Sequence, residues 1–267
     1  MPARDDDLDL LITAAQDSAA IAMLYFKRQI QIWDKGSDLG PVTEADLAVN
    51  QHLKTTLMAA RPDYGWLSEE TPDDTQRLGK DTVFILDPID GTRAFISGLP
   101  LWTTLIGLRQ NGVPTIGVVG QPYIGEIFIG GPSGAYLLTR DGGQTPIATR
   151  KCATLEDAVA ATTDADIFQG TDRQGWERLK SSVRLARYGC DAYAYAMLAA
   201  GRIDVVAESE LKVWDWSALM PLVKAAGGAF TGWDGQAPTA ADGRVLALGD
   251  ARLSAAALAH LNGQGNL

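Results

Sequence analysis

The chain has 267 residues, 46% of them hydrophobic and 21% charged, which is the composition of an ordinary globular protein. Its 33 acidic and 23 basic side chains give a formal charge of −10, which argues against an open nucleic-acid-binding surface. Two Cys and two His exclude Cys/His zinc sites, CxxC redox chemistry and a disulfide scaffold. Any chemistry must therefore come mainly from oxygen ligands. The length suits one large α/β domain or two closely joined lobes.

The N-terminal sequence MPARDDDLDLLITAAQ has no cationic start followed by an apolar core, so we expect no secretory signal. No stretch approaches about 18 uncharged apolar residues, so we expect no membrane span. With few Cys and no export signal, the cytoplasm is the expected compartment.

The N-terminal part of the chain predicts two helices joined by a turn. Residues 8–30 carry apolar side chains at three- and four-residue spacing, which is typical of an amphipathic helix. Residues 32–41 contain glycine and proline and predict a turn or hairpin. Thr43 is followed three residues later by Asp46, which predicts a capping box at the start of the second helix.

A set of strands is expected next. Residues 64–68 predict a strand, and the polar residues 71–80 predict a mobile surface loop. Residues 82–86 (TVFIL) are continuously apolar and predict a strand that is buried on both faces and stops at residue 87. Residues 93–97 can form a helical turn. Alternating patterns then predict strands over residues 103–109, 115–121, 126–129, 136–138 and 145–148.

From about residue 150 the pattern changes to alternating strands and helices. Two lobes forming one compact unit account for the whole chain: an α+β lobe over residues 1–140 and an α/β lobe over residues 141–267. In the second lobe we expect strands over residues 158–161, 183–187, 203–207 and 245–249, and helices over residues 173–181, 192–200, 215–226 and 254–262.

The sequence Asp-Pro-Ile-Asp-Gly-Thr at residues 87–92 is the most informative motif. It places Asp87 and Asp90 three residues apart where a buried strand is expected to end, and strand ends are where α/β sheets bind ligands. A helical turn beginning at Gly91 would present free amides to an anion such as phosphate. Carboxylates beside an anion cradle need a bridging cation, and oxygen ligands indicate Mg²⁺ or Mn²⁺. The alternative is a simple turn with an Asx cap.

Other acidic residues can join this pair. Glu69 and Glu70 follow a predicted strand, and Asp215 would begin a predicted helix. Taken singly, Glu69 and Glu70 are solvated loop charges, Asp215 is a helix N-cap, and Asp46 is a capping residue. The hypothesis of a metal site depends on combining these residues.

That combination resembles the inositol monophosphatase superfamily, a group of Mg²⁺-dependent, lithium-sensitive phosphomonoesterases. The resemblance is carried by Glu69-Glu70, by residues 87–92, by Trp214-Asp215 and by the Ala-Ala-Gly-Gly sequence of residues 225–228, and it extends from about residue 8 to residue 250. It implies a mixed α+β and α/β fold, a layered αβαβα sandwich, and a protein that is commonly a homodimer.

The resemblance also implies a set of metal ligands for two or three Mg²⁺ ions, with Mn²⁺ as an alternative. Asp87 would bridge two metals, and the carbonyl of Ile89 would complete one coordination shell. The full set of expected metal ligands is Glu69, Asp87, Ile89, Asp90 and Asp215.

The same resemblance assigns catalytic and phosphate-binding roles. Thr92 matches a hydroxyl that contacts the nucleophilic water, and Asp46 matches the acid that hydrogen-bonds this threonine. With Asp90, these are the expected catalytic residues. The amides of Gly91 and Thr92 would hold the phosphate, and Lys35 matches a basic residue near the site. A Thr–Asp pair can orient the water or accept its proton without any histidine.

The substrate is expected to be read by the C-terminal lobe. Inositol-specific members carry a small apolar residue where this chain has Asp191, and its Tyr-Gly-x-Asp sequence is similar to the histidinol-phosphatase branch. Asp191 and Glu208 could bind the ammonium and imidazole groups of that substrate by charge-assisted hydrogen bonds. Asp191 is otherwise an N-cap of the following helix, and Glu208 a surface acid at a strand end. Tyr193 and Tyr195 are assigned to core packing.

The leading hypothesis is a cytoplasmic, Mg²⁺-dependent phosphomonoesterase that hydrolyses L-histidinol phosphate in histidine biosynthesis. Its partners would be a small phosphorylated substrate and a second copy of the chain, with no nucleic acid and no membrane. The alternatives are an inositol-1-monophosphatase and, less favoured, a 3′-phosphate nucleotidase. A catalytically silent metal-dependent binding protein is the alternative outside enzymes.

Overall fold

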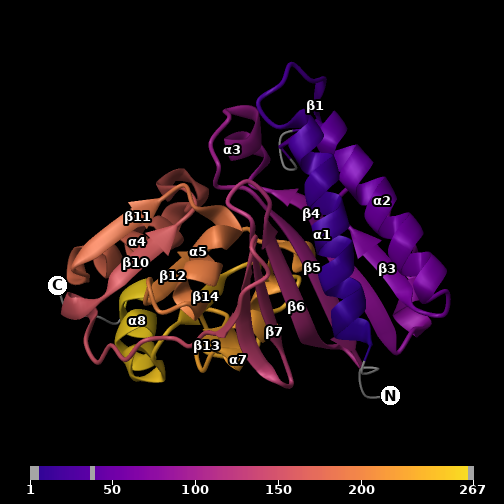
Figure 1. Ribbon diagram of the computed structural model, residues 1–267. Helices are drawn as coiled ribbons and strands as arrows, with labels where there is room; N and C mark the ends of the chain where they lie inside the picture. Colours follow the sequence, from indigo (N-terminus) through magenta and orange to yellow (C-terminus); the bar gives the residue numbers. More distant parts are fainter. Residues whose placement is uncertain (1–5, 37–39, 264–267) are drawn as a thin grey trace.

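The computed structural model describes residues 6–36 and 40–263 and shows alternating layers of helix and sheet (Figure 1). Residues 1–5 of the N-terminal sequence and residues 37–39 lie outside the described residues. On either side of that internal gap, β1 (Ile32–Asp34) and β2 (Pro41–Thr43) pair antiparallel, which confirms the hairpin expected over residues 32–41.

The first layer consists of the two N-terminal helices, α1 (Asp7–Tyr25) and α2 (Glu44–Ala60), which pack side by side. Thr43 and Asp46 form the predicted capping box at the start of α2. The first helix ends earlier than residue 30, because Lys27 adopts a φ of 61° that a right-handed helix cannot continue through.

Among the described residues, α1 alone is long and apolar enough to span a bilayer. This is weak evidence for membrane insertion, because the core helix of a soluble protein passes the same test. In the structure α1 packs against α2 and β6 and buries Leu11, Ala14 and Ala22 completely.

The second layer is a seven-stranded sheet in which β3 and β4 are parallel and the remaining neighbours are antiparallel. The predicted end of β4 at residue 86 was wrong: the strand continues to Asp90, with a shift of its register against β5 between Asp87 and Asp90. The strands, in spatial order, are β3 (Gly65–Ser68), β4 (Thr82–Asp90), β5 (Thr103–Gln110), β6 (Val113–Gln121), β7 (Glu126–Gly131), β8 (Gly134–Thr139) and β9 (Gln144–Pro146).

A five-stranded sheet forms the fourth layer. Its strand order is β11-β10-β12-β14-β13, with β10 parallel to β11 and β12 and with β14 antiparallel to its neighbours. One strand, β13, was not expected from the sequence. The bounds are β10 (Val159–Thr162), β11 (Leu185–Tyr188), β12 (Val205–Glu208), β13 (Ala229–Thr231) and β14 (Val245–Leu248).

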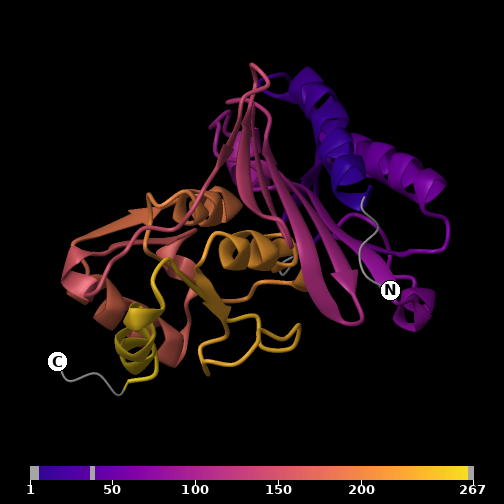
Figure 2. The ribbon, with the colours of Figure 1, turned by 60° about the horizontal axis from the view of Figure 1, so that its bottom comes forward.

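Helices fill the space between the sheets and cover the outer face of the second sheet, and Figure 2 shows the same order of layers from another side. α5 (Asp191–Ala199) and α7 (Leu219–Ala225) lie between the sheets, whereas α4 (Gly170–Ser182) and α8 (Ser254–Leu261) pack together on the outside. This arrangement confirms the expected αβαβα sandwich. The shorter elements are α3 (Thr92–Ile96), α6 (Val213–Trp216), η1 (Thr75–Gly79), η2 (Leu155–Asp157), η3 (Ala165–Ile167) and η4 (Ala251–Leu253).

The single helix predicted over residues 215–226 was wrong, because α6 and α7 are separate helices. The chain between and within them lies directly on the seven-stranded sheet. A Cβ atom on Gly117 would collide with the carbonyl of Ala218, and one on Gly130 would collide with the backbone of Leu222. Glycine at these two strand positions therefore permits the close backbone contact of Ala218 and α7 with β6 and β7.

The division of the chain at residue 140 stays a prediction. The last strand of the seven-stranded sheet ends at Pro146, and the first strand of the five-stranded sheet begins at Val159. We keep two lobes as the proposed description, with the candidate site between the two sheets.

Candidate active site

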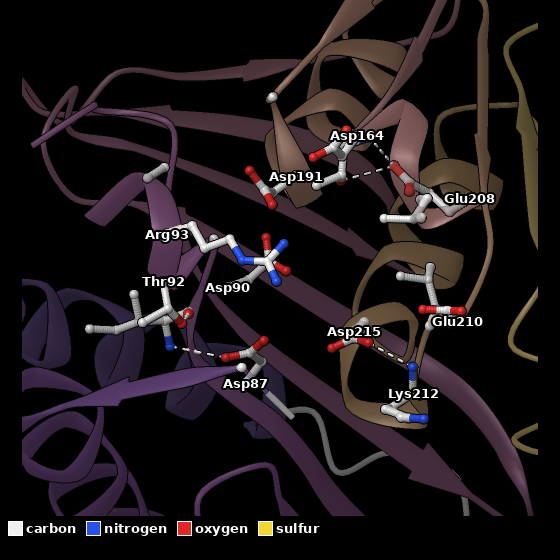
Figure 3. Close-up of a pocket in the computed structure, with 18 of the residues that line it drawn as sticks. Asp87, Asp90, Thr92, Arg93, Asp164, Asp191, Glu208, Glu210, Lys212 and Asp215 are labelled. Carbon is white, nitrogen blue, oxygen red and sulfur yellow. Dashed lines mark hydrogen bonds between the residues drawn. The ribbon is translucent and has the colours of Figure 1, made fainter. Parts of the chain in front are cut away.

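One large pocket, of about 880 Å³, is lined by the end of β4, the start of α3 and residues next to α5, α6 and β12 (Figure 3). It lies at the carboxyl ends of the parallel strands β3 and β4, where sheets of this kind bind ligands. Of the residues expected at or near the site, Asp46 and Lys35 are not among those that line it. The pocket gathers Glu69, Asp87, Ile89, Asp90, Gly91, Thr92, Asp191, Glu208 and Asp215.

Three of the expected metal ligands form a tight cluster of carboxylates. Oxygens of Glu69, Asp87 and Asp215 lie within 4.8 Å of one another. The amide of Glu69 donates to the carbonyl of Leu86 over 3.2 Å, which fixes this residue beside β4. The amide of Lys212 donates to the Asp215 carboxylate over 2.6 Å, which orients that side chain at the start of α6.

The electrostatics of this cluster fit a divalent cation. Burial raises the pKa of Asp87 well above its usual range, and the charges of Glu69 and Asp90 add to the effect. Burial and the charge of Glu69 likewise raise the pKa of Asp215 to about 7. Because buried like charges are costly without a counter-ion, and because the donors are all hard oxygens, the arrangement suits Mg²⁺.

Lys35 supplies a cation at one side of the cluster. Its Nζ lies 2.8 Å from Oε1 of Glu69 and 2.6 Å from Oε1 of Glu70. Burial raises the pKa of Glu70 to about 7 although Lys35 opposes this shift. The ammonium group of Lys35 therefore contacts the carboxylate of Glu69, which is also a proposed metal ligand.

The end of β4 is held in place by local hydrogen bonds. The Asp87 carboxylate accepts from the amide of Ile89 over 3.0 Å, and the hydroxyl of Thr104 donates to the carbonyl of Pro88 over 2.8 Å. The hydroxyl of Thr92 donates to the carbonyl of Ile89 over 3.1 Å, and that oxygen retains a second lone pair. Gly91 joins strand to helix with a φ of 82°, which glycine adopts without strain.

Asp90 lies outside the three-carboxylate cluster and makes a contact that the sequence did not predict. Its Oδ2 accepts a hydrogen bond from the amide of Ala192 over 2.8 Å and so caps α5. The alternative in which Asp191 caps this helix was wrong, because Asp191 makes no capping bond and has a φ of 44°. Its carboxylate instead packs beside Gly91.

Asp46 is not hydrogen-bonded to Thr92, contrary to the expectation. Its Oδ2 accepts from the amide of Thr43 over 2.8 Å and from the Thr43 hydroxyl over 2.5 Å. Its Oδ1 is buried and has no hydrogen-bond partner among the described residues. Burial raises the pKa of Asp46 to about 6. One oxygen of the Asp46 side chain, Oδ2, therefore caps α2, and the other, Oδ1, can still accept a hydrogen bond.

The two expected substrate residues lie on a wall of the pocket opposite Asp87 (Figure 3). Glu208 is 1% exposed, so its alternative interpretation as a surface acid was wrong. It accepts from the hydroxyl of Thr162 over 3.2 Å and from the amide of Thr163 over 2.7 Å. Burial raises the pKa of Glu208 to about 8 and that of Asp191 to about 6.

Comparison with known proteins decides the family. Residues 4–265 match the inositol monophosphatase family. The chain belongs to the inositol monophosphatase family. A member of this family is a metal-dependent phosphatase of small phosphorylated substrates, and the carboxylate cluster described above is present in this chain.

Named members of the inositol monophosphatase family show how close the similarity is. A chloroplastic bifunctional phosphatase of Arabidopsis thaliana is 35% identical over 92% of this chain and 72% of its own length. A histidinol-phosphatase of Mycobacterium tuberculosis is 33% identical over 87% of this chain and 89% of its own. A solved inositol monophosphatase from Zymomonas mobilis superposes with a TM-score of 0.84 at 32% identity, covering 98% of this chain and 99% of that one.

Two further residues of this family member line the pocket region and were missed from the sequence. Arg93 lies in α3 and extends over the pocket near Asp90, and its charge partly offsets the raised pKa of Asp191 (Figure 3). Its position in the sequence directly after Thr92, an expected site residue, could have identified Arg93 as a pocket residue. Tyr195 was assigned to the core, but it also lines a small cavity beside the pocket. Its position four residues after Asp191, on the same helical face, was the signal.

Proposed function

We propose that this chain is a Mg²⁺-dependent phosphomonoesterase that hydrolyses L-histidinol phosphate to L-histidinol and inorganic phosphate in histidine biosynthesis. The observation that carries this proposal is the charge of the pocket wall beyond the carboxylate cluster. Five acidic residues line the pocket there, and the basic residues in its described lining are Arg93 and Lys212. The five acids are Asp164, Asp191, Glu208, Glu210 and Asp242.

Such a wall suits a phosphate ester whose alcohol part is cationic. L-histidinol phosphate carries an ammonium group and an imidazole, both of which can donate charge-assisted hydrogen bonds to Asp191 and Glu208. A neutral polyol would gain less, because it must desolvate the same buried carboxylates without supplying a counter-charge.

The residues that would hold two or three Mg²⁺ ions, or Mn²⁺ ions, are Glu69, Asp87, Asp90 and Asp215 with the carbonyl of Ile89. When bound, the metal would lower the pKa of a bound water molecule and neutralise the negative charge of the phosphate oxygens. The chain itself contributes mainly positioning, because its donors are fixed by the backbone contacts of β3, β4 and α6.

Thr92 and Asp46 are proposed to orient the attacking water. Thr92 lines the pocket, and while its hydroxyl donates to the carbonyl of Ile89, the hydroxyl oxygen can still accept a hydrogen bond from the water. Asp46 has a buried acceptor oxygen free for the proton that the Thr92 hydroxyl or the water presents. The amides of Gly91 and Thr92 are proposed to hold the phosphate against the cluster.

Hydrolysis of inositol 1-phosphate is the second candidate, favoured by the similarity to the solved inositol monophosphatase from Zymomonas mobilis. A 3′-phosphate nucleotidase is less favoured, because the described pocket lining has no basic cluster for a second phosphate beyond the two separate side chains of Arg93 and Lys212. A silent binding protein would not need Glu69, Asp87 and Asp215 to converge as they do.

We also propose that the enzyme is a homodimer and works in the cytoplasm, as expected from its family resemblance and its sequence. Light scattering of the purified chain tests the first point. A mass of one chain at all concentrations would contradict it.

Release of phosphate from a panel of esters tests the activity. The panel contains L-histidinol phosphate, inositol 1-phosphate and a nucleoside 3′,5′-bisphosphate, each with Mg²⁺ and with a chelator. The proposal expects turnover that requires the metal and is fastest with L-histidinol phosphate. Absence of turnover on every ester with Mg²⁺ would favour the binding protein.

A further inference from the structure

A second, small cavity of about 20 Å³ adjoins the main pocket. It shares Asp90, Asp191, Glu208 and Asp215 with the main pocket and adds the side chain of Tyr195. No Lys, Arg or His is among the described residues that line it. Its volume accommodates one group of the size of a water molecule. We call this cavity the niche.

Tyr195 places an unsatisfied polar group beside these carboxylates. Its side chain is 2% exposed, and its hydroxyl has no hydrogen-bond partner among the described residues. Burial raises the pKa of this hydroxyl well above its usual range, and the charges of Glu208 and Asp90 act in the same direction. Tyr195, Glu208 and Asp90 line the same small cavity. A buried hydroxyl left in this state favours a ligand that can bond to it.

Hydrogen bonds and helix geometry fix the positions of two carboxyl groups of the niche, those of Glu208 and Asp191. Thr162 and Thr163 donate to both oxygens of Glu208, so that side chain has one orientation. Asp191 lies one helical turn before Tyr195 in α5, so both side chains project from the same face of the helix. Together they offer two carboxyl groups and one phenolic oxygen around a space for a single small group.

We propose that the niche binds the primary ammonium group of the substrate, on the carbon next to the one that carries the phosphate ester. This inference rests on the proposed function and extends it to a substrate class, the phosphate esters of 2-amino alcohols. An ammonium group is the size of a water molecule and donates three hydrogen bonds, which match Asp191, Glu208 and the Tyr195 oxygen. An imidazole ring is too large for this space and stays in the main pocket.

The position of the niche agrees with this chemistry. Asp90 and Asp215 line both the niche and the proposed metal centre. A group that enters the niche must therefore lie close to the ester oxygen, as the amine of a 2-amino alcohol does. A cation farther along the molecule would instead meet Asp164 or Glu210 in the main pocket.

A substrate-and-residue cycle tests the assignment. The substrates are L-histidinol phosphate and its analogue without the amine, 3-(imidazol-4-yl)propyl phosphate, and the variants are the wild type and Tyr195→Phe. The proposal expects the wild type to prefer the amine by at least about tenfold in kcat/KM. Tyr195→Phe should lose about tenfold on the amine substrate and no more than about twofold on the analogue.

Tyr193→Phe is the matched control. Tyr193 lies on the same helix, and its hydroxyl donates to Glu126 over 2.7 Å, so its removal takes a hydroxyl from α5 without touching the niche. This control should leave the ratio between the two substrates unchanged. Thermal unfolding of both variants checks that the loss of a hydroxyl has not unfolded the chain.

Equal losses of kcat/KM on both substrates in Tyr195→Phe would contradict the assignment of the niche as an ammonium site. Equal wild-type kcat/KM for L-histidinol phosphate and for its analogue without the amine would contradict it as well. If the wild type does not hydrolyse L-histidinol phosphate, the proposed function fails, and the niche is then tested with 2-aminoethyl phosphate against ethyl phosphate. A preference for the amine in that pair that Tyr195→Phe removes would support the niche. No preference would overturn it as well.

Discussion

The carboxylate of Asp90 accepts a hydrogen bond over 2.8 Å from the backbone amide of Ala192, which lies 102 residues farther along the chain. Asp90 ends β4 of the seven-stranded sheet, and Ala192 is in the first turn of α5, between the two sheets. A proposed metal ligand therefore also caps the helix that carries Asp191 and Tyr195. This contact joins the proposed metal site to the substrate wall.

Asp90→Asn should remove most activity and leave the fold intact. The amide oxygen of asparagine can still accept from Ala192, whereas its neutral side chain is a poor Mg²⁺ ligand. We expect kcat with Mg²⁺ to fall on the order of 100-fold. Asp90→Ala should lose the same activity and an additional ~1 kcal/mol of stability, because it also removes the cap. Near-normal turnover of Asp90→Asn would contradict its assignment as a metal ligand.

Thr92→Ala should lower kcat more than it raises KM. The hydroxyl is proposed to orient the attacking water, so its contribution is made at the chemical step. Steady-state kinetics at saturating Mg²⁺ measure the split, and Thr92→Ser should restore most of kcat. An effect confined to KM would contradict the water-orienting role.

Asp191→Asn should reduce kcat/KM for L-histidinol phosphate far more than for inositol 1-phosphate. We choose asparagine because Asp191 has a φ of 44°, which asparagine tolerates better than alanine. Loss of a charge-assisted hydrogen bond to a cationic substrate should cost about ten- to one-hundredfold. Equal losses on both esters would leave Asp191 with a purely structural role.

Glu208→Gln should alter how stability depends on pH. Burial raises the pKa of Glu208 from 4.5 to about 8. The folded state therefore holds this proton more tightly than the unfolded state, so the contribution of Glu208 to stability is complete below pH 4.5 and is lost as the pH rises through 8. Between pH 5 and pH 8, the metal-free wild type should lose more unfolding free energy than Glu208→Gln, by roughly 1–4 kcal/mol. Parallel denaturation curves at both pH values would contradict this.

Lys35→Gln should make the thermal stability of the protein depend more strongly on Mg²⁺. Lys35 neutralises Glu69 and Glu70 at distances of 2.8 and 2.6 Å, and its removal leaves those carboxylates without their cation. We expect the Tm of the chelated variant to fall by about 2–4 °C and the rise in Tm on adding Mg²⁺ to be larger than in the wild type. Calorimetry should show tighter Mg²⁺ binding. An unchanged metal affinity would show that Lys35 does not compete for Glu69.

The sequence predicts elements well where one local rule decides them. The capping box of Thr43 and Asp46 depends only on their spacing, and it is present. The split into α6 and α7 was missed although the sequence carries a local signal for it: Pro221 has no amide hydrogen to donate to the carbonyl of Ser217, so a single regular helix cannot run through residues 215–226. β13 has three residues, too few for a recognisable periodicity.

The site shows a division between local and long-range information. The motif of residues 87–92 identifies Asp87 and Asp90 from chemistry and resemblance alone. The cap that Asp90 gives to Ala192 joins distant segments, so local patterns could not assign it. Tyr195 has the apolar neighbours of a core residue, and only the three-dimensional placement of Glu208 and Asp90 beside it indicates a role in binding.

The most direct test of the whole account is a side-by-side measurement of kcat/KM for L-histidinol phosphate and inositol 1-phosphate with saturating Mg²⁺. The acidic wall formed by Asp191 and Glu208 predicts a preference for L-histidinol phosphate of about 100-fold or more. Equal values, or a preference for inositol 1-phosphate, would contradict the proposed substrate.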